Sequence, residues 1–510
     1  MANFKKTVQV KDIVIGGADY QKFISIEASN AEELRDRIEQ ACTIEEAGVE
    51  ICAGSMHQIG DIAPVLAECK DILAKKVVIL NLNTYGYDSE SSADEKLRVA
   101  EACAAYVDII GADEFAEKAF IDSLKEVTSR TGKKLLLSYI CLDGTKSKED
   151  IISAAKAAET KGADLVYLAY SVKDDPDVIV LGYAAKEMRQ GDLVSIPFCV
   201  YPLGEVGLLT RVLSGHCGNS FGFYKLVEPE GGMFESYDQH KRLFDIYHSF
   251  TKLQSKVQYN IDGHVMGGER FIRCMMIKQR TKDDILAAAR DVARYNPEMV
   301  EWRIDYCIPM GSGAFIENYW IETLKEIKAI LPGAPILLTF RVKKEGGCKW
   351  YPDAIRLKLT KALINTGLIA YADCEIDNAP EYIKAMQEVC KANGTKLVIS
   401  QHKWTETPDN QEIIDTFREC LDKGADLPKF YLTATNYEDA VRTSEVSRQM
   451  RETFLDVPCI ICAMGDTGLI TRTMGGEIGA DFEFIDVTGI RGGDEEDIHY
   501  VDQLQEIFGY

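Results

Sequence analysis

The chain has 510 residues, 46% of them hydrophobic and 27% charged, which is typical of a folded protein of two to four domains. Its formal net charge of −23 argues against nucleic acid and against an anionic membrane surface, since both attract basic proteins. The sequence has no apolar run of membrane-spanning length and no apolar signal-peptide core, so we expect a cytoplasmic protein that binds a small molecule.

In the first half, a hairpin-like segment precedes short apolar runs that alternate with amphipathic stretches. The hairpin joins Thr7–Val10 to Ile15–Gly17. The apolar runs follow at Phe23–Ile26, Val49–Cys52, Val77–Leu82, Tyr106–Ile110, Lys134–Tyr139, Leu165–Ala169, Ser195–Tyr201 and Ser220–Tyr224. Eight such runs separated by helical stretches are typical of a (β/α)8 barrel.

The second half repeats this order. Its hairpin joins Val257–Asn260 to Met266–Gly268. Its apolar runs are Phe271–Met276, Met299–Trp302, Ile336–Phe340, Ala370–Cys374, Lys396–Ile399, Phe430–Thr433, Val457–Ala463 and Phe482–Val487. No linker rich in Pro, Gly or Ser separates the halves, and we expect domains at 1–252 and 253–510.

Short phrases recur between the halves. Lys161–Leu165 returns as Lys423–Leu427, and Gly207–Arg211 returns as Gly468–Arg472. We also match Tyr106–Asp108 to Tyr371–Asp373. Offsets near 260 residues indicate duplication of a whole domain, because solenoid repeats recur every 20–50 residues. The sequence therefore predicts an α/β fold of two tandem (β/α)8 TIM barrels, each opening with a hairpin.

Fifteen cysteines are scattered through the apolar runs. Their odd number and their settings favour free buried thiols over disulfides. Cys459 and Cys462 have the spacing of a metal-ligand pair, but no second pair accompanies them. We therefore expect no metal.

Polar side chains gather where the predicted strands of the second half end, which is where such barrels carry their active sites. Lys429 lies among apolar neighbours, which disfavours a charged ammonium and leaves an amine able to attack a carbonyl. His402, on the adjacent strand, is suited to moving protons. Asp373 and Glu375 either brace the nearby cations or take part in the chemistry. This set predicts imine-based elimination or aldol chemistry on a small anionic oxo-acid.

Several phrases of the second half resemble type I 3-dehydroquinate dehydratase, and the resemblance extends over nearly the whole half. The phrases are Glu301–Asp305, Leu338–Arg341, Lys344–Gly347, Ser400–His402 and Gly424–Lys429. The resemblance implies a barrel enzyme, commonly dimeric, that needs no metal or cofactor. It further implies dehydration of 3-dehydroquinate to 3-dehydroshikimate, in quinate metabolism or in the shikimate pathway of aromatic amino acid biosynthesis.

By position, the resemblance assigns a role to each of these side chains. Lys429 would form the imine, His402 would transfer protons and Glu345 would pair with His402. Substrate contacts would come from Glu301, Arg303, Arg341 and Arg472, the last through the substrate carboxylate.

Three positions that would contact the substrate depart from the family pattern. A serine and a glutamine of the closing loop become Arg491 and Glu495, and a serine near the hairpin strand becomes Cys274. The substrate would then be 3-dehydroquinate or a closely related hydroxylated cyclic oxo-acid.

The first half lacks most of this set. It has Tyr167 for the lysine, Ile140 for the histidine and Asn81, or a near neighbour, for the arginine of strand three, whereas Glu50 and Arg211 persist. Without an amine this copy cannot form an imine. It either binds an anion through Arg211 or takes the place of a second subunit, which would make the chain a pseudo-dimer; association into a homo-oligomer is a further possibility.

Two other functions are compatible with the sequence. An imine-based C–C lyase, like a class I aldolase, would use the same lysine. A non-catalytic tandem pseudoenzyme would act as a sensor or scaffold, the altered closing loop having ended turnover.

Overall fold

Two compact units make up the chain. The computed structural model describes residues 4–83, 91–227, 233–307, 317–487 and 496–509. One unit comprises Met1–Phe244 with Gln503–Tyr510, and the other comprises Asp245–Asp502. The division thus falls close to the expected one, except that the last residues group with the first unit. Ile507 accounts for this, since it packs against Gly182 so closely that a Cβ on the glycine would lie 2.7 Å from it.

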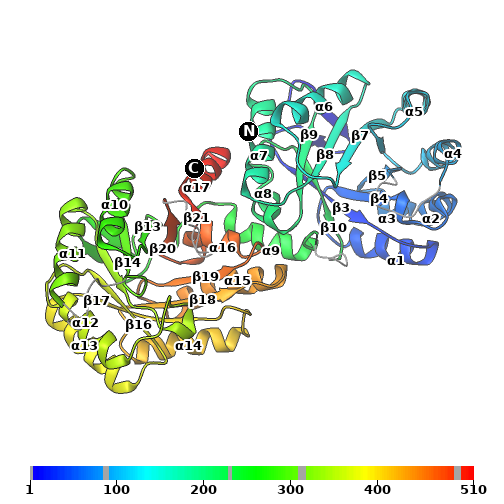
Figure 1. Cartoon of the computed structure of the whole chain (residues 1–510). Helices are drawn as coiled ribbons and strands as arrows, with labels where there is room; N and C mark the ends of the chain where they lie inside the picture. Colours follow the sequence, from blue (N-terminus) through cyan, green and yellow to red (C-terminus); the bar gives the residue numbers. More distant parts are fainter. Residues whose placement is uncertain (1–3, 84–90, 228–232, 308–316, 488–495, 510) are drawn as a thin grey trace. The chain divides into compact units, whose positions relative to one another are not determined.

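The first unit contains a hairpin and a sheet of eight parallel strands (Figure 1). The hairpin pairs β1 (Val8–Val10) with β2 (Ile13–Ile15). The sheet has the order β10-β3-β4-β5-β6-β7-β8-β9, with strands at β3 (Gln21–Ile26), β4 (Gly48–Cys52), β5 (Val77–Asn81), β6 (Ile109–Asp113), β7 (Lys134–Cys141), β8 (Leu165–Ser171), β9 (Phe198–Leu203) and β10 (Phe221–Lys225). The helices are α1 (Ala31–Cys42), α2 (Ile62–Glu68), α3 (Lys70–Leu73), α4 (Ala93–Cys103), α5 (Lys118–Thr131), α6 (Lys148–Thr160), α7 (Asp175–Gln190), α8 (Leu208–Val212) and α9 (Tyr237–Tyr247).

The second unit repeats this plan with β11 (Tyr259–Ile261) and β12 (His264–Met266) as its hairpin. Its sheet has the order β19-β18-β17-β16-β15-β14-β13-β20-β21, with strands at β13 (Ile272–Ile277), β14 (Met299–Arg303), β15 (Ile336–Thr339), β16 (Tyr371–Glu375), β17 (Lys396–His402), β18 (Leu427–Thr433), β19 (Ile460–Met464), β20 (Phe482–Asp486) and β21 (Glu496–Asp497). Its helices are α10 (Lys282–Ala293), α11 (Glu317–Ile330), α12 (Asp353–Ile364), α13 (Pro380–Asn393), α14 (Asn410–Asp422), α15 (Tyr437–Thr453), α16 (Leu469–Thr473) and α17 (Ile498–Phe508). The two predicted barrels are confirmed.

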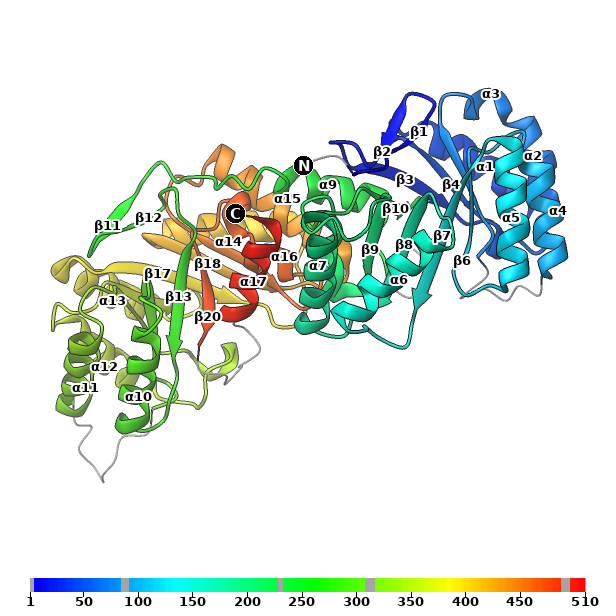
Figure 2. The ribbon, with the colours of Figure 1, turned by 90° about the horizontal axis from the view of Figure 1, so that it is seen from above.

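In the second barrel the strands have an apolar layer on each face. Inward-facing residues such as Leu337, Val398 and Leu427 form one cluster inside the barrel. Outward-facing residues such as Leu338 and Ile399 pack in another cluster with residues of the surrounding helices, which Figure 2 shows outside the strands. Side chains alternate between faces along a strand, so the residue two places after each inward one also faces the interior. This alternation places Ser400 and Lys429 above the inner apolar layer.

All fifteen cysteines are free, as the sequence predicted. No helix of the described part of the chain is long and apolar enough to cross a bilayer.

A buried aspartate closes the second barrel where β19 and β20 begin. The backbone N–H of Asp481 donates to the Cys459 carbonyl at 2.9 Å, and the Cys459 N–H donates to the Asp481 carboxylate at 2.8 Å. The same carboxylate pairs with Arg451 at 3.1 Å and with Lys252 at 2.6 Å. Because the Asp481 side chain is fully buried, its charge depends on these two cations.

Replacing Asp481 with Asn should destabilise the second barrel by about 3–5 kcal/mol, because two buried cations lose their partner. The melting temperature of this unit should fall by roughly 10 °C in a calorimetric scan. The matched control is Asp502→Asn, which removes a half-exposed partner of Arg273 and should change stability by about 1 kcal/mol or less. Equal effects of the two substitutions would contradict this account of the closure.

Candidate active site

Lys429, at the third position of β18, lies inside the second barrel. Its side chain is 3% exposed, and its ammonium lies 4.6 Å from the centre of the Phe484 ring and 5.2 Å from that of Tyr431. The sequence predicted apolar neighbours for this lysine, and the two rings supply them. A carboxylate also reaches it, because Lys429 Nζ lies 3.5 Å from Asp373 Oδ2.

Asp373, on β16, is the centre of a buried polar network. Arg341 Nη2 donates to its Oδ2 at 2.9 Å, and the Ser400 hydroxyl donates to its Oδ1 at 2.7 Å. Burial acts to raise the pKa of Asp373, but Arg341 and Lys429 outweigh it and hold the pKa below its ordinary value. Asp373 is therefore a carboxylate at neutral pH, shared by a guanidinium and an amine.

Arg341 is fixed by further contacts. Its Nη1 donates to Glu375 at 3.1 Å and to the Ser400 hydroxyl at 2.8 Å, and its side chain is only 3% exposed. Arg356, on α12, lies 3.3 Å from the other oxygen of Glu375. Burial opposes the charge of Arg341, but Asp373 and Glu375 raise its pKa above the ordinary value. Asp373 and Glu375 thus brace the cations, one of the two roles open from the sequence.

His402 pairs with a carboxyl group and lies between two aromatic rings. Its Nδ1 is 3.0 Å from Glu345 Oε2. The imidazole stacks on Trp404 with ring centres 5.3 Å apart and on Tyr431 with centres 5.6 Å apart. Burial, Arg341 and Lys429 lower the pKa of His402 well below 6.5, so the imidazole is neutral at pH 7. A neutral imidazole so held can accept a proton from a neighbouring carbon.

Burial raises the pKa of Glu345 to about 7. The carboxyl therefore changes its charge near neutral pH while it contacts His402. This makes the Glu345–His402 pair sensitive to pH in the range where most enzymes work.

Glu301 and Arg303 point from β14 into the same region. Thr339 donates its hydroxyl to Glu301, and Arg303 donates to both oxygens of Asp305 at 2.9 and 3.1 Å. Burial opposes the charge of Arg303, but Asp305 raises its pKa above the ordinary value. Both residues are thus held in ionic or hydrogen-bonded positions before any ligand binds.

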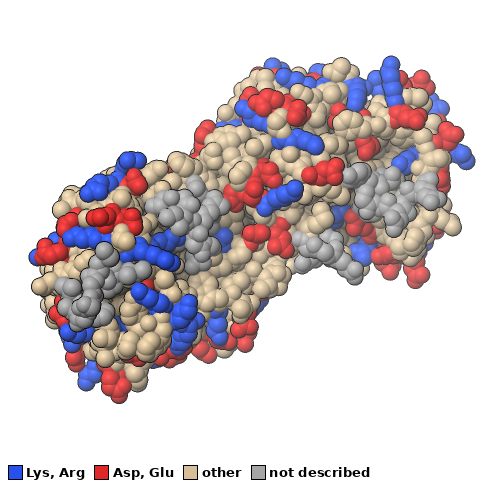
Figure 3. Space-filling view, viewed as in Figure 1, with Lys and Arg blue, Asp and Glu red and all other residues tan. Residues whose placement is uncertain are grey.

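These side chains line one small cavity of about 30 Å³, formed by Met276, Glu301, Arg303, Arg341, Glu345, Gly346, His402, Trp404, Lys429, Tyr431 and Phe484. The sequence predicted six of the lining positions: Glu301, Arg303, Arg341, Glu345, His402 and Lys429. Three are basic residues, so the local charge favours an anion despite the negative net charge of the chain. On the face shown in Figure 3, acidic and basic side chains are interspersed.

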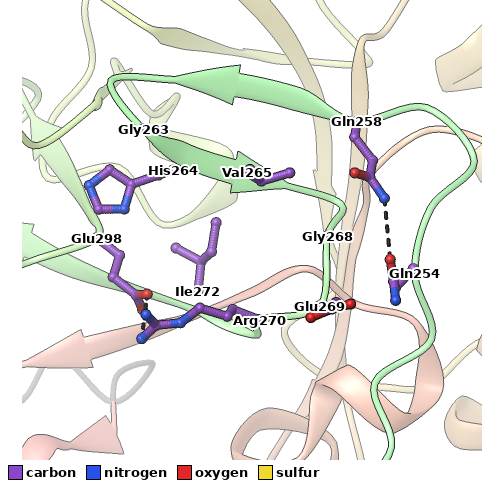
Figure 4. A pocket seen from close by; sticks show the side chains of 10 residues that line it. All are labelled: Gln254, Gln258, Gly263, His264, Val265, Gly268, Glu269, Arg270, Ile272 and Glu298. Atoms are coloured by element: carbon purple, nitrogen blue, oxygen red, sulfur yellow. Dashed lines mark hydrogen bonds and ion pairs between the residues drawn. The ribbon is translucent and has the colours of Figure 1, made fainter.

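Two larger pockets lie away from this site. One, of about 390 Å³, borders the hairpin β11–β12 of the second unit, and Figure 4 shows Arg270 and Glu298 paired at its edge, 2.7 Å apart. The other, of about 460 Å³, is in the first unit beside Phe4 and Arg189. The first has no lysine among its lining residues, and in the second Lys5 is exposed and paired with Asp192 while Lys186 donates to the Glu506 carbonyl. The smaller cavity holds a buried lysine together with a paired histidine and carboxyl group, so it is the better candidate for chemistry.

The structure does not bring every predicted residue to the cavity. Cys274 is fully buried in the inner apolar layer, and Met276, two residues further along β13, lines the cavity instead. Arg472 is on α16 and donates Nη1 to the carbonyls of Ala463 and Gly465. Arg491 and Glu495 lie outside the described residues.

Sequence reasoning missed the aromatic part of the site. Tyr431 follows Lys429 by two residues on β18 and so continues on the inward face, whereas Trp404 lies beyond β17, which ends at His402. Strand alternation could have identified Tyr431, which the register of β17 with β18 places opposite His402.

The comparisons with known proteins agree with this geometry. The sequence profile of the type I 3-dehydroquinase family matches residues 22–243 and 273–490, which together are more than half of the chain. The chain belongs to this family. A 3-dehydroquinate dehydratase of Klebsiella pneumoniae subsp. pneumoniae is 30% identical over 217 residues, 42% of this chain and 84% of that protein. One from Geobacillus thermodenitrificans is 28% identical over 232 residues, 45% of this chain and 88% of the relative.

A solved structure of 3-dehydroquinate dehydratase from Geobacillus kaustophilus HTA426 has a TM-score of 0.47 and 24% identity. It covers 50% of this chain and 97% of its own. Relatives with this name are carbon–oxygen lyases, so the chain belongs to an enzyme family of that class.

Both barrels match the 3-dehydroquinase profile, but the strand registers show how far the first has diverged. Tyr167 lies opposite Ser138 as Lys429 lies opposite Ser400, so Tyr167 occupies the position of the lysine. Likewise Ile140 occupies the position of His402. Asp113 pairs with Ser138 as Glu375 pairs with Ser400, which puts Gly111 at the position of Asp373.

This register corrects one expectation and narrows another. Asp108 had been matched to Asp373, but it precedes β6 and its carboxylate accepts from the Val78 N–H at 2.9 Å. The equivalent of Arg341 is Asn83, a near neighbour of Asn81, since Asn83 contacts Ser138 at 3.3 Å as Arg341 contacts Ser400. Asn81 instead corresponds to Thr339, and it donates to Glu50 at 2.8 Å.

Arg211 in the first barrel is paired with a carboxylate of its own unit. Its Nη1 contacts the carbonyls of Pro202 and Gly204, just as Arg472 contacts those of Ala463 and Gly465. Its Nε donates to Glu235 at 2.7 Å, and both side chains are essentially unexposed. Glu235 therefore occupies the edge of the Arg211 guanidinium to which an anionic ligand would bind.

No group of three or more His, Cys, Asp and Glu side chains within the described ranges is arranged to hold a metal ion.

The raised pKa of Glu345 gives a stability prediction with a defined sign. Because the folded value of about 7 exceeds the ordinary 4.5, the stabilisation is complete below pH 4.5 and is lost as the pH rises through 7. Relative to Glu345→Gln, the chain should therefore lose about 3 kcal/mol of unfolding free energy between pH 4.5 and pH 8. Calorimetry at the two pH values measures this. A difference that does not change with pH would contradict the raised pKa, and Glu326→Gln, which removes a surface partner of Lys282, serves as the control.

Proposed function

We propose that the second barrel is a Schiff-base 3-dehydroquinate dehydratase, acting on 3-dehydroquinate or a closely related hydroxylated cyclic oxo-acid. The single observation that carries the proposal is the buried Lys429 amine, beside Asp373 and in one cavity with His402. Membership of the 3-dehydroquinase family supports the same reaction.

In this proposal Lys429 attacks the ring ketone, and loss of water gives an iminium. The carboxylate of Asp373 already accepts from Arg341 and Ser400, so the lysine can give up its proton without leaving that charge unpaired. The iminium draws electrons from the adjacent C–H bond and makes it acidic.

His402 then takes the proton from that carbon and returns a proton to the departing hydroxyl, which leaves as water. Its neutral state at pH 7 suits the first step. Glu345 orients the imidazole through Nδ1. Hydrolysis of the product imine frees Lys429.

Arg303, Glu301 and Arg341 line the cavity at positions suited to binding the substrate oxygens. Arg472 is proposed to bind the substrate carboxylate, by analogy with Arg211, which binds the carboxylate of Glu235. In that pair the Nη1 contacts two carbonyls while the remaining edge takes the carboxylate. Arg491, Glu495 and Cys274 stay predictions as substrate contacts.

We further propose that the first barrel is non-catalytic. It has a tyrosine in place of the amine, and its Arg211 is bound by Glu235 rather than open to a ligand. If the first barrel is non-catalytic, the chain has one catalytic site.

Borohydride reduction in the presence of 3-dehydroquinate should attach one ligand per chain, and the modified peptide should contain Lys429. Lys429→Met should abolish the adduct and lower kcat more than about 10³-fold, because the covalent route is lost. The control is Lys396→Met, a partly exposed lysine at the start of β17 that pairs with Asp426. Two adducts per chain, or none, would refute one site per chain. An adduct with carbon–carbon cleavage products would favour the aldolase-like alternative, and no adduct with any cyclic oxo-acid would favour the scaffold.

Replacing Glu235 with Gln should lower the stability of the first unit and leave the activity of the chain unchanged. It leaves the buried Arg211 without its carboxylate, so the first unit should lose about 3–5 kcal/mol of stability. Below its melting temperature, kcat/KM should stay within two-fold of the unmodified chain. Asp238→Asn, which removes an exposed partner of Arg242, should change neither quantity. Loss of activity in the folded Glu235 variant would show that the first barrel contributes to catalysis.

A further inference from the structure

Trp404 contacts His402 and the turn that follows Glu345. Its indole stacks on the His402 imidazole with 16° between the ring planes. It also packs over Gly346, the neighbour of Glu345, where an added Cβ would lie 3.0 Å from Trp404 Cζ2. Gly346 has a φ of +87°, so the turn after Glu345 depends on a glycine that the indole covers. The ring therefore restricts the imidazole and this turn together.

The indole N–H of Trp404 is buried and has no hydrogen-bond partner among the residues that the structure describes. A buried donor without an acceptor costs free energy, so such a group calls for an explanation. Trp302 and Trp320 also have unpartnered indole nitrogens, but they belong to the apolar cluster that strands and helices form outside the barrel. Trp404 differs because it lines the cavity that holds Lys429 and His402.

We propose that Trp404 determines specificity, by donating its indole N–H to an oxygen of the bound substrate while its ring positions His402. This inference rests on the proposed function and narrows its substrate class. The ligand must present an acceptor oxygen on the side of the substrate ring that faces His402. A hydroxylated oxo-acid has such oxygens, and an analogue without that oxygen leaves the donor unpaired.

A neutral hydrogen-bond donor suits the position of Trp404 beside His402. An indole N–H can donate but neither accepts nor ionises, so it selects for an oxygen without adding charge beside His402. The basic and carboxyl side chains of the cavity attract ligands by charge as well as by hydrogen bonding, whereas the indole N–H acts by hydrogen bonding alone. A site that pairs a buried polar group with the substrate rejects analogues that lack the partner atom.

Trp404→Phe tests the donor, because a phenyl ring still stacks on His402 but has no N–H. We expect KM to rise about five-fold with kcat within two-fold. Trp404→Leu removes the stacking as well, so kcat should also fall. Trp320→Phe, a change in the outer apolar cluster, should leave KM unaltered. An unchanged KM in Trp404→Phe would overturn the inference and leave the proposed function standing.

A second measurement uses the unmodified chain and so does not depend on how a variant folds. With ¹⁵N-labelled tryptophan, the four indole N–H signals can be followed as the product 3-dehydroshikimate is added. The Trp404 signal should move downfield while those of Trp302, Trp320 and Trp350 stay in place. Ligand binding with no movement of the Trp404 signal would overturn the inference. Absence of both turnover and borohydride adduct would instead refute the proposed function, and the inference with it.

Discussion

The shared carboxylate of Asp373 is the interaction on which the site depends. It lies inside a barrel, where a charge is stable only if opposite charges and hydrogen bonds surround it. Arg341 and Ser400 provide these contacts at 2.9 and 2.7 Å, and Lys429 is the third neighbour at 3.5 Å. The guanidinium already pairs with the carboxylate, so in the proposed mechanism Lys429 is the member of this network that reacts with the substrate.

The same constraint bears on the proposal that the first barrel is non-catalytic. Its positions equivalent to Asp373, Arg341 and Lys429 hold Gly111, Asn83 and Tyr167, so all three charges are absent together. Removing only one would have left a buried charge unpaired, at a cost of several kcal/mol. Ser138, the uncharged member, is retained and contacts Asn83. Arg211 persists because Glu235 supplies the carboxylate that it requires.

Much of the fold could be predicted from the sequence because parallel barrel strands are short, apolar and separated by amphipathic helices. Both hairpins and all sixteen barrel strands lie at or near their expected places. The largest shift is at β6, expected at Tyr106–Ile110 and found at Ile109–Asp113. That shift of three residues caused the mistaken match of Asp108 to Asp373, because side chains on a strand can be compared only when the register is known.

The candidate site was predicted where a motif fixes the residue, as for Lys429, His402 and Glu345. It was missed for Tyr431, Met276 and Trp404 because no motif marks them; strand alternation would have found the first two, whereas Trp404 lies beyond the end of β17. Sequence spacing also could not show that Glu235, 24 residues after Arg211, would take up the arginine. Contacts of this kind depend on how loops return to the barrel, which local patterns do not encode.

A crystal structure of the chain reduced with borohydride in the presence of 3-dehydroquinate tests the central claim most directly. The account predicts continuous density from Lys429 Nζ to a ring carbon of the ligand. The His402 imidazole should lie within hydrogen-bond reach of the reacting carbon or the leaving oxygen, and Glu235 should still be paired with Arg211. A ligand bound without attachment to Lys429, or seated on Arg211 in the first barrel, would contradict it.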